Sequence, residues 1–252
     1  MCNERAMKNI LKKISLVFLG IAVLAAAFFV ISLFFDEAVF VRKGTLYRAK
    51  VPEKLVALTF DDGPSPEWTP KVLDELKEAQ VKATFFMLGD HVRRYPEIAR
   101  RVLAEGHEIE NHTYDHHVLI YYKMDELEKE IKDAQDTIKD VTGVVPRYFR
   151  PPKAWLFSRE KKKIEEMGYR IVLWSLNSKD WVTFHDKQIT AYILKRIQPG
   201  DIILFHDSGG VFTAEGGNRK QTVKTIPRLV KKLKERGYRF VTINELMSEQ
   251  HP

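Results

Sequence analysis

Short apolar runs alternate along this chain with longer segments whose apolar residues recur every three or four positions. Continuous apolar runs bounded by turn residues are typical of buried strands, and apolar residues at helical spacing are typical of amphipathic helices. Strands are expected near residues 55–61, 83–88, 107–110, 148–149, 170–176, 202–205 and 239–243. Helices are expected near residues 69–79, 96–104, 125–141, 159–167, 187–197 and 223–236, with Thr69 as the N-cap of the first.

This alternation predicts βα units built around a parallel sheet. The favoured fold is α/β, a (β/α) barrel that is distorted or seven-stranded, and the alternative is an open, doubly wound sheet. In a barrel, the loops that follow the carboxyl ends of the strands share one rim. Polar residues at several strand ends can therefore act together.

The start of the chain differs from the rest. Four basic residues precede an uncharged run of 22 residues at 14–35, which is long enough to cross a bilayer as one helix. A cleaved signal peptide is the alternative, because residues 25–27 are three alanines, but the apolar run continues past them. We expect residues 1–35 to be a cytoplasmic start and a single-pass signal anchor, 36–53 a tether, and 54–252 a catalytic domain outside the cytoplasmic membrane.

Charge and cysteine usage narrow the function classes. The chain has 41 basic and 34 acidic residues, and residues 1–35 hold four and one of these, which leaves 37 against 33, a net charge of +4. Such a mild excess does not indicate a nucleic-acid partner, and no protein partner is evident. The only cysteine, Cys2, lies before the apolar run, so the predicted exported part contains no disulfide.

The first strand ends in two adjacent acids, Asp61 and Asp62, followed by Gly63 and Pro64. Adjacent carboxylates repel each other, so such a pair commonly serves a cation or a proton transfer. The alternative is that both residues only shape a turn, for which aspartate before Gly-Pro is well suited. This stretch alone leaves the two interpretations open.

Further chemistry-bearing residues follow other predicted strands. His112 and His116 are spaced i, i+4, which would place both imidazoles on one face of a helical turn, as in zinc-binding helices. Together with Asp62 they make a three-ligand set with open coordination positions, as in catalytic zinc sites, and the set also suits iron or cobalt. His107 and His117 are interpreted as non-ligands.

The sequence resembles a known family at these positions. Residues 59–64 and 112–116 resemble the first two motifs of the polysaccharide deacetylases, carbohydrate esterase family 4. Residues 150–152, 180–181 and 204–206 resemble its third, fourth and fifth motifs, so the resemblance spans residues 55–243. It implies one divalent metal ion, with zinc favoured and cobalt or another transition metal as alternatives. The implied ligands are Asp62, His112 and His116.

The resemblance also implies the acid and the base. Asp61 is the implied general base, oriented by Arg150, and His206 is the implied general acid, oriented by Asp180. These roles agree with the chemistry of amide hydrolysis, in which a base takes a proton from water and an acid protonates the leaving nitrogen. The products are acetate and a free amine on the sugar.

Three residues are implied to contact the substrate, namely Pro152, Trp181 and Leu204, the last two at the acetyl methyl. The chain departs from the family pattern in the third motif, with Lys153 in place of an aromatic residue and Ala154 in place of glycine. In the fourth motif Asn177 stands where an acid is common. Because the implied oxyanion contact at the third motif is a backbone N–H, catalysis is expected to survive these changes.

The favoured function is a membrane-anchored, metal-dependent N-deacetylase of a cell-wall glycan, with peptidoglycan as the favoured polymer. One alternative is a catalytically weak glycan-binding domain, suggested by the third-motif departures; another, a phosphodiester hydrolase, has less support because no ligands for a second metal are evident. The glycine-rich segment 207–218 starts at the expected site. It is interpreted either as a flap over the sugar chain, with Phe212 as a stacking surface, or as an ordinary surface loop.

Overall fold

The computed structural model describes residues 11–27, 38, 42–183, 185–210 and 215–250. Residues 11–27 are helical, and residues 28–35 of the predicted membrane-spanning run lie outside the described residues. Within the part that is described, no helix combines the length and the hydropathy needed to cross a bilayer. The membrane anchor stays a prediction.

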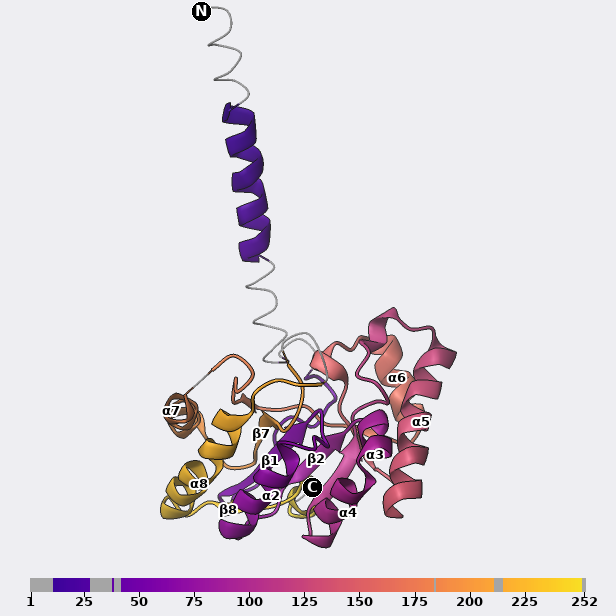
Figure 1. Cartoon of the computed structure of the whole chain (residues 1–252), viewed down its shortest axis with the longest axis vertical. Coiled ribbons are helices and arrows are strands. Elements are labelled where there is room, and N and C mark those ends of the chain that lie inside the picture. The colour runs from indigo at the N-terminus through magenta and orange to yellow at the C-terminus, as the bar shows by residue number, and fades with distance from the viewer. Residues whose placement is uncertain (1–10, 28–37, 39–41, 184, 211–214, 251–252) are drawn as a thin grey trace, which may run out of the picture.

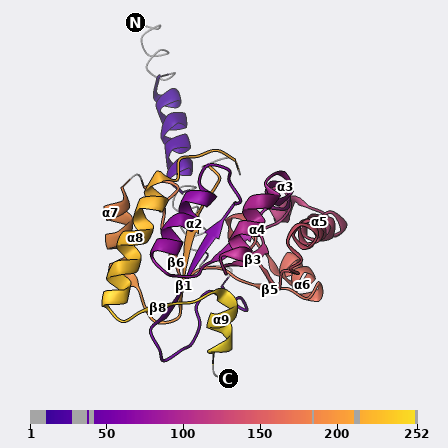
Figure 2. The ribbon, with the colours of Figure 1, turned by 60° about the horizontal axis from the view of Figure 1, so that its bottom comes forward.

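The core of the fold is a curled parallel sheet, visible at the centre of Figures 1 and 2. Seven strands follow the order β5-β4-β3-β2-β1-β7-β6, and an eighth, β8, pairs with the start of β1. The strands are β1 Leu55–Asp61, β2 Thr84–Met87, β3 Glu108–Asn111, β4 Tyr148–Phe149, β5 Arg170–Ile171, β6 Leu176–Asn177, β7 Asp201–His206 and β8 Arg239–Phe240. This confirms the predicted α/β class and parallel sheet.

Helices surround the sheet, most of them on its convex face. They are α2 Thr69–Glu78, α3 Gly89–Arg94, α4 Pro96–Ala104, α5 Met124–Thr142, α6 Ser158–Glu166, α7 Asp186–Arg196, α8 Lys220–Glu235 and α9 Ile243–Ser248. Around the sheet, α7, α8, α2, α4, α5 and α6 follow one another, each in contact with the next (Figure 1). The six helices expected from apolar spacing are all present, whereas α3 and α9 were not predicted.

Strand β1 is buried on both faces, as a central parallel strand should be. Val56, Leu58 and Phe60 pack in one apolar cluster with residues of α2 and α8. Leu55 and Ala57 pack in a second cluster on the concave face of the sheet. Because side chains alternate along a strand, the later odd-numbered residues of β1 also face the concave side.

The sheet does not close by direct strand pairing within the described residues, since β5 and β6 stand at its two ends. The chain just before β1 lies at this gap. Leu46 pairs with Val172, and Arg48 pairs with Asp201 at the start of β7. Arg48 also donates from Nε to an Asp201 carboxylate oxygen at 2.6 Å. Part of the predicted tether is therefore packed into the domain.

Three local predictions were wrong. The segment 170–176 is two strands, β5 and β6, because its middle residues bond to Leu46 and Ile202 and not to one continuous neighbour. The predicted last strand, 239–243, is only β8, and its end begins α9. Thr69 is the first residue of α2 and not its N-cap; its hydroxyl donates to Asp207 at 2.5 Å.

Candidate active site

The carboxyl end of β1 brings Asp61 to the concave side of the sheet, on the same face as Thr59. Arg150, fully buried after β4, reaches both: its Nη1 donates to Asp61 Oδ1 at 2.6 Å and to Thr59 Oγ1 at 2.8 Å. Its other nitrogens donate to the main-chain oxygens of residues 172 and 173. The guanidinium fixes the orientation of Asp61 and compensates its buried charge.

Asp62 points elsewhere because its backbone adopts the left-handed conformation, with φ 74°. Its Oδ1 is buried and has no hydrogen-bond partner among the described residues. His116 Nε2 lies 3.2 Å and His112 Nε2 3.4 Å from it. A buried carboxylate oxygen that faces two imidazole nitrogens and accepts no hydrogen bond fits a cation bound between them.

The two histidines meet in a way that the sequence did not predict. The segment from His112 to His116 is not helical, and the helical-turn argument for their spacing was wrong. Thr113 and His116 both have left-handed φ values, 77° and 67°, and this sharp loop brings the second imidazole back beside the first. The ring centroids lie 5.2 Å apart.

Nδ1 of His112 donates to the carbonyl oxygen of Arg150 at 2.7 Å. A carbonyl oxygen only accepts, so the proton is on Nδ1 and the lone pair of Nε2 is available to a metal. The ligand atoms of Asp62, His112 and His116 lie within 4.8 Å of one another, the one such cluster found among the described residues. His107 and His117 are not part of it.

The pKa shifts of His116 and Asp62 favour the protonation states that bind a metal ion. Burial lowers the pKa of His116 to about 4, although the Asp62 carboxylate partly opposes this. Burial alone would raise the pKa of Asp62, but His116, His112 and His206 outweigh that effect and hold it well below its usual value. At neutral pH the residues present a carboxylate and a neutral imidazole, the forms that bind metal ions. This donor set fits one divalent ion with further coordination positions for water and substrate.

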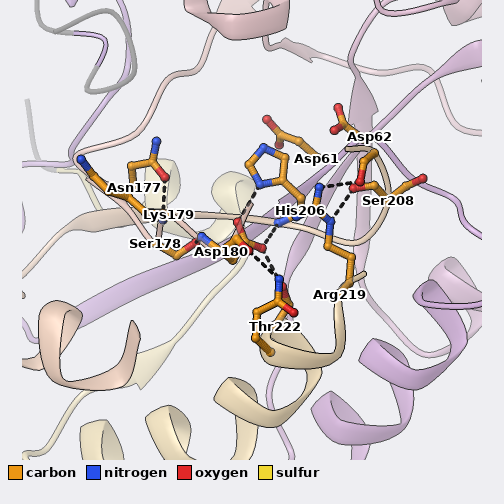
Figure 3. Close-up of polar contacts among 12 residues, drawn as sticks. Asp61, Asp62, Asn177, Ser178, Lys179, Asp180, His206, Ser208, Arg219 and Thr222 are labelled. Carbon is orange, nitrogen blue, oxygen red and sulfur yellow. Dashed lines mark hydrogen bonds and ion pairs between the residues drawn. The ribbon is translucent and has the colours of Figure 1, made fainter. Parts of the chain in front are cut away.

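Strand β7 lies beside β1, and His206 is the register partner of Asp61. Asp180 lies between His206 and Thr222 (Figure 3). Its Oδ1 accepts from His206 Nδ1 at 2.8 Å, and its Oδ2 accepts from His206 N at 2.9 Å and from the Thr222 hydroxyl at 2.7 Å. Nε2 of His206 is then the ring nitrogen available to a substrate.

The same contacts set the charges of this pair. Burial would lower the pKa of His206, but the charge and hydrogen bond of Asp180 outweigh it and raise the pKa above its ordinary value. Sequence reasoning missed Thr222 and Gln221, whose side-chain amide donates to the Asp180 carbonyl at 2.6 Å. Both lie in the first turn of α8, 41 and 42 residues from Asp180, so no local pattern connects them to the site.

The described parts of the predicted flap are tied to the site. Arg219 donates from Nε to the Ser208 carbonyl at 2.7 Å and from Nη2 to the Gly209 carbonyl at 2.6 Å (Figure 3). Gly209 has φ +74°, and a Cβ there would lie 2.2 Å from Asp62 Oδ2. Only glycine permits this approach of the main chain to the Asp62 carboxylate. Phe212, the predicted stacking residue, lies outside the described residues.

The residues implied to contact substrate are placed as follows. Trp181 follows Asp180 and is half-buried, whereas Leu204 and Pro152 are buried. Lys153 and Ala154 both have left-handed φ values, 56° and 54°. The backbone at the departures in the third motif thus adopts a conformation that glycine takes without strain.

Comparison with known proteins identifies the family. A sequence model described as polysaccharide deacetylase matches residues 48–172. A peptidoglycan-N-acetylglucosamine deacetylase of Bacillus cereus is 39% identical over 201 residues, which are 79% of this chain and 91% of that protein. The chain belongs to the polysaccharide deacetylase family.

Solved structures of polysaccharide deacetylases share the fold. The crystal structure of the Bc1960 peptidoglycan N-acetylglucosamine deacetylase superposes with a TM-score of 0.76 at 35% identity, covering 81% of this chain and 92% of that one. A CE4 family pseudoenzyme from Bacillus anthracis superposes with a TM-score of 0.73 at 26% identity, covering 82% and 69%. The polysaccharide deacetylase fold therefore occurs with and without activity, and the site residues must distinguish the two.

Proposed function

We propose that this protein is a metal-dependent N-deacetylase that removes acetyl groups from N-acetylglucosamine residues of peptidoglycan and releases acetate. The observation that carries the proposal is the orphaned Oδ1 of Asp62 between two imidazoles, flanked by an Asp61–Arg150 pair and an Asp180–His206 pair. Similar proteins are named peptidoglycan N-acetylglucosamine deacetylases, which supports the N-acetyl amide as the bond cleaved and peptidoglycan as the polymer.

In this mechanism Asp62, His112 and His116 would hold the metal. The bound metal would supply Lewis-acid activation of the acetamide and of the water. Asp61, whose Oδ1 is held by Arg150, accepts the proton of that water while the water oxygen forms a bond to the acetyl carbon.

The second proton transfer takes place at the leaving nitrogen. An amine anion is a very poor leaving group, so the nitrogen must gain a proton as the C–N bond breaks. His206, kept protonated by Asp180, donates that proton from Nε2. The products are the free amine and acetic acid, which gives its proton to solvent and leaves as acetate. The proton held by Asp61 balances the one given by His206.

We assign zinc as the metal, with cobalt or another transition metal as the alternative. A carboxylate oxygen and two imidazole nitrogens with open positions are typical of catalytic zinc. The same ligands also accept other divalent transition metals, and affinity alone does not discriminate among them.

A glycan-binding domain without turnover is the second candidate, favoured by the third-motif departures and by the existence of a pseudoenzyme with this fold. The complete set of ligands, base and acid argues for the enzyme. Acetate release from peptidoglycan in the presence of Zn²⁺ or Co²⁺ tests the first proposal. An Asp61→Asn variant with full activity would rule out the mechanism, and glycan retention without any acetate release would favour the binding domain.

We further propose that residues 14–35 anchor the chain in the cell membrane, with the catalytic domain on the outer side where the wall polymer lies. The support is the uncharged run of 22 residues after Lys12 and Lys13. Fractionation of cells that express the full chain, followed by protease treatment of intact spheroplasts, tests both the anchor and the side of the membrane.

A further inference from the structure

The loop between the two histidine ligands is held in an unfavourable conformation. Thr113 and His116 are both left-handed, at φ 77° and 67°, and each non-glycine residue in this region costs about 1–3 kcal/mol. The conformation persists only if surrounding contacts stabilise it. Those contacts decide whether His116 stays beside Asp62.

The first set of contacts comes from the start of α3. The main-chain N–H of Gly89 donates to the Thr113 carbonyl at 3.0 Å, and that of Asp90 donates to the Tyr114 carbonyl at 2.9 Å. These bonds hold the carbonyl side of the loop. They are main-chain bonds and do not depend on a side chain.

The second set comes from Glu130 of α5. The main-chain N–H groups of Tyr114 and Asp115 both donate to Glu130 Oε1, each at 2.9 Å. Glu130 lies 15 and 16 residues beyond these two positions and is half-buried. Burial raises the pKa of Glu130 to about 7. The ionised form binds an N–H group about twice as strongly as a neutral acceptor does, and the neutral form keeps an oxygen that can accept both bonds.

We propose that Glu130 is a positioning residue for the metal site, which holds the 113–116 loop so that His116 stays in ligand position. The inference rests on the proposed metal site of Asp62, His112 and His116. Glu130 does not touch the metal or the substrate and acts through two backbone amides. Residues that orient metal ligands in this way typically change metal affinity by roughly 10–100-fold when replaced.

Zn²⁺ affinity of the full chain in detergent, measured by competition with a chromophoric chelator, tests this role. Glu130→Leu removes the acceptor at similar volume, and we expect roughly 10–100-fold weaker Zn²⁺ binding. Glu130→Gln keeps an amide oxygen that can accept both N–H bonds, and it should restore affinity to within about threefold. Asp140→Ala, at an exposed acid of the same helix, is the control and should bind as the wild type does.

Unchanged Zn²⁺ affinity of Glu130→Leu would overturn the inference. A Glu130→Gln variant that binds Zn²⁺ as weakly as Glu130→Leu would also overturn it, because the charge of Glu130 and not its hydrogen bonds would then control the affinity. If the Leu variant is too unstable to isolate, Glu130→Ala takes its place, with the same expected loss of Zn²⁺ affinity and the same contradicting outcome. A wild-type chain that binds no Zn²⁺ would overturn the metal site itself, whereas normal wild-type binding with an unaffected Leu variant overturns only the role of Glu130.

Discussion

Replacing Asp180 by asparagine removes the negative charge that keeps His206 protonated. Burial alone would raise the pKa of Asp180, but the charge and hydrogen bonds of His206, with the Thr222 hydroxyl, hold it at about 2 instead of 3.8. That difference corresponds to about 2 kcal/mol at about 1.4 kcal/mol per pH unit. Because each group stabilises the charged form of the other, losing the carboxylate should lower the pKa of His206.

The sign of the effect follows from the role of the acid. A general acid works while it is protonated, so activity is present below the pKa of His206 and is lost as the pH rises through it. The alkaline limb of kcat for Asp180→Asn should therefore move to lower pH. The asparagine also cannot accept from both His206 N and His206 Nδ1 as the carboxylate does, so kcat at its optimum should fall by about 10²–10⁴-fold.

Acetate release from a glycan oligomer, measured from pH 5 to pH 10, checks both effects. An aryl acetate is the matched control, because its phenolate leaves without a proton and needs no general acid. The loss of kcat should be much smaller on the aryl ester. An alkaline limb that stays in place, or an equal loss on both substrates, would refute the assignment of His206 as the acid held by Asp180.

Three further substitutions test the surrounding structure. Gly209→Ala places a Cβ 2.2 Å from Asp62 Oδ2, at a residue whose φ is +74°. Zn²⁺ affinity, measured by chelator competition, should therefore fall at least about tenfold. Unchanged affinity would contradict the close approach of Gly209 to Asp62. Arg150→Met leaves Asp61 buried without its cation, and the free energy of unfolding measured in urea should fall by about 3–5 kcal/mol. A fall below about 1 kcal/mol would mean that water solvates the Asp61–Arg150 pair. Ala154→Gly relieves a left-handed alanine and should stabilise the fold by roughly 0.5–1 kcal/mol in the same assay; a less stable glycine variant would contradict the strain.

Most of the order of strands and helices could be predicted because the longer elements carry their own period, whereas the short helices α3 and α9 were not predicted. The buried run at 55–61 and the helix at 96–104 have strong local patterns, and their observed bounds agree closely with the expected ones. The sequence of segment 170–176 contains no pattern that shows where β5 ends and β6 begins. Its apolar residues continue while the hydrogen-bond partner changes from β4 to Leu46 and then to β7, and a change of partner leaves no trace in the periodicity.

The position of the site was predictable for a related reason. Polar residues that follow buried strands were expected to share one rim, and parallel register places Asp61 opposite His206. The sequence could not show how the loop places the His116 side chain beside that of His112. That geometry depends on backbone angles at Thr113 and on a carboxylate from another helix, Glu130, and neither follows from i, i+4 spacing.

The site therefore has two halves with different supports. Asp61 and His206 stand at the ends of neighbouring paired strands, whereas His116 stands in a loop kept in shape by side-chain and helix-end contacts. Sites that share no partners usually respond to mutation independently. Asp180→Asn should change the pH profile and leave Zn²⁺ affinity within about twofold of the wild type. Glu130→Leu at saturating Zn²⁺ should recover the wild-type pH profile. A variant of one half that changes both measurements would show that the two halves are coupled through Asp62.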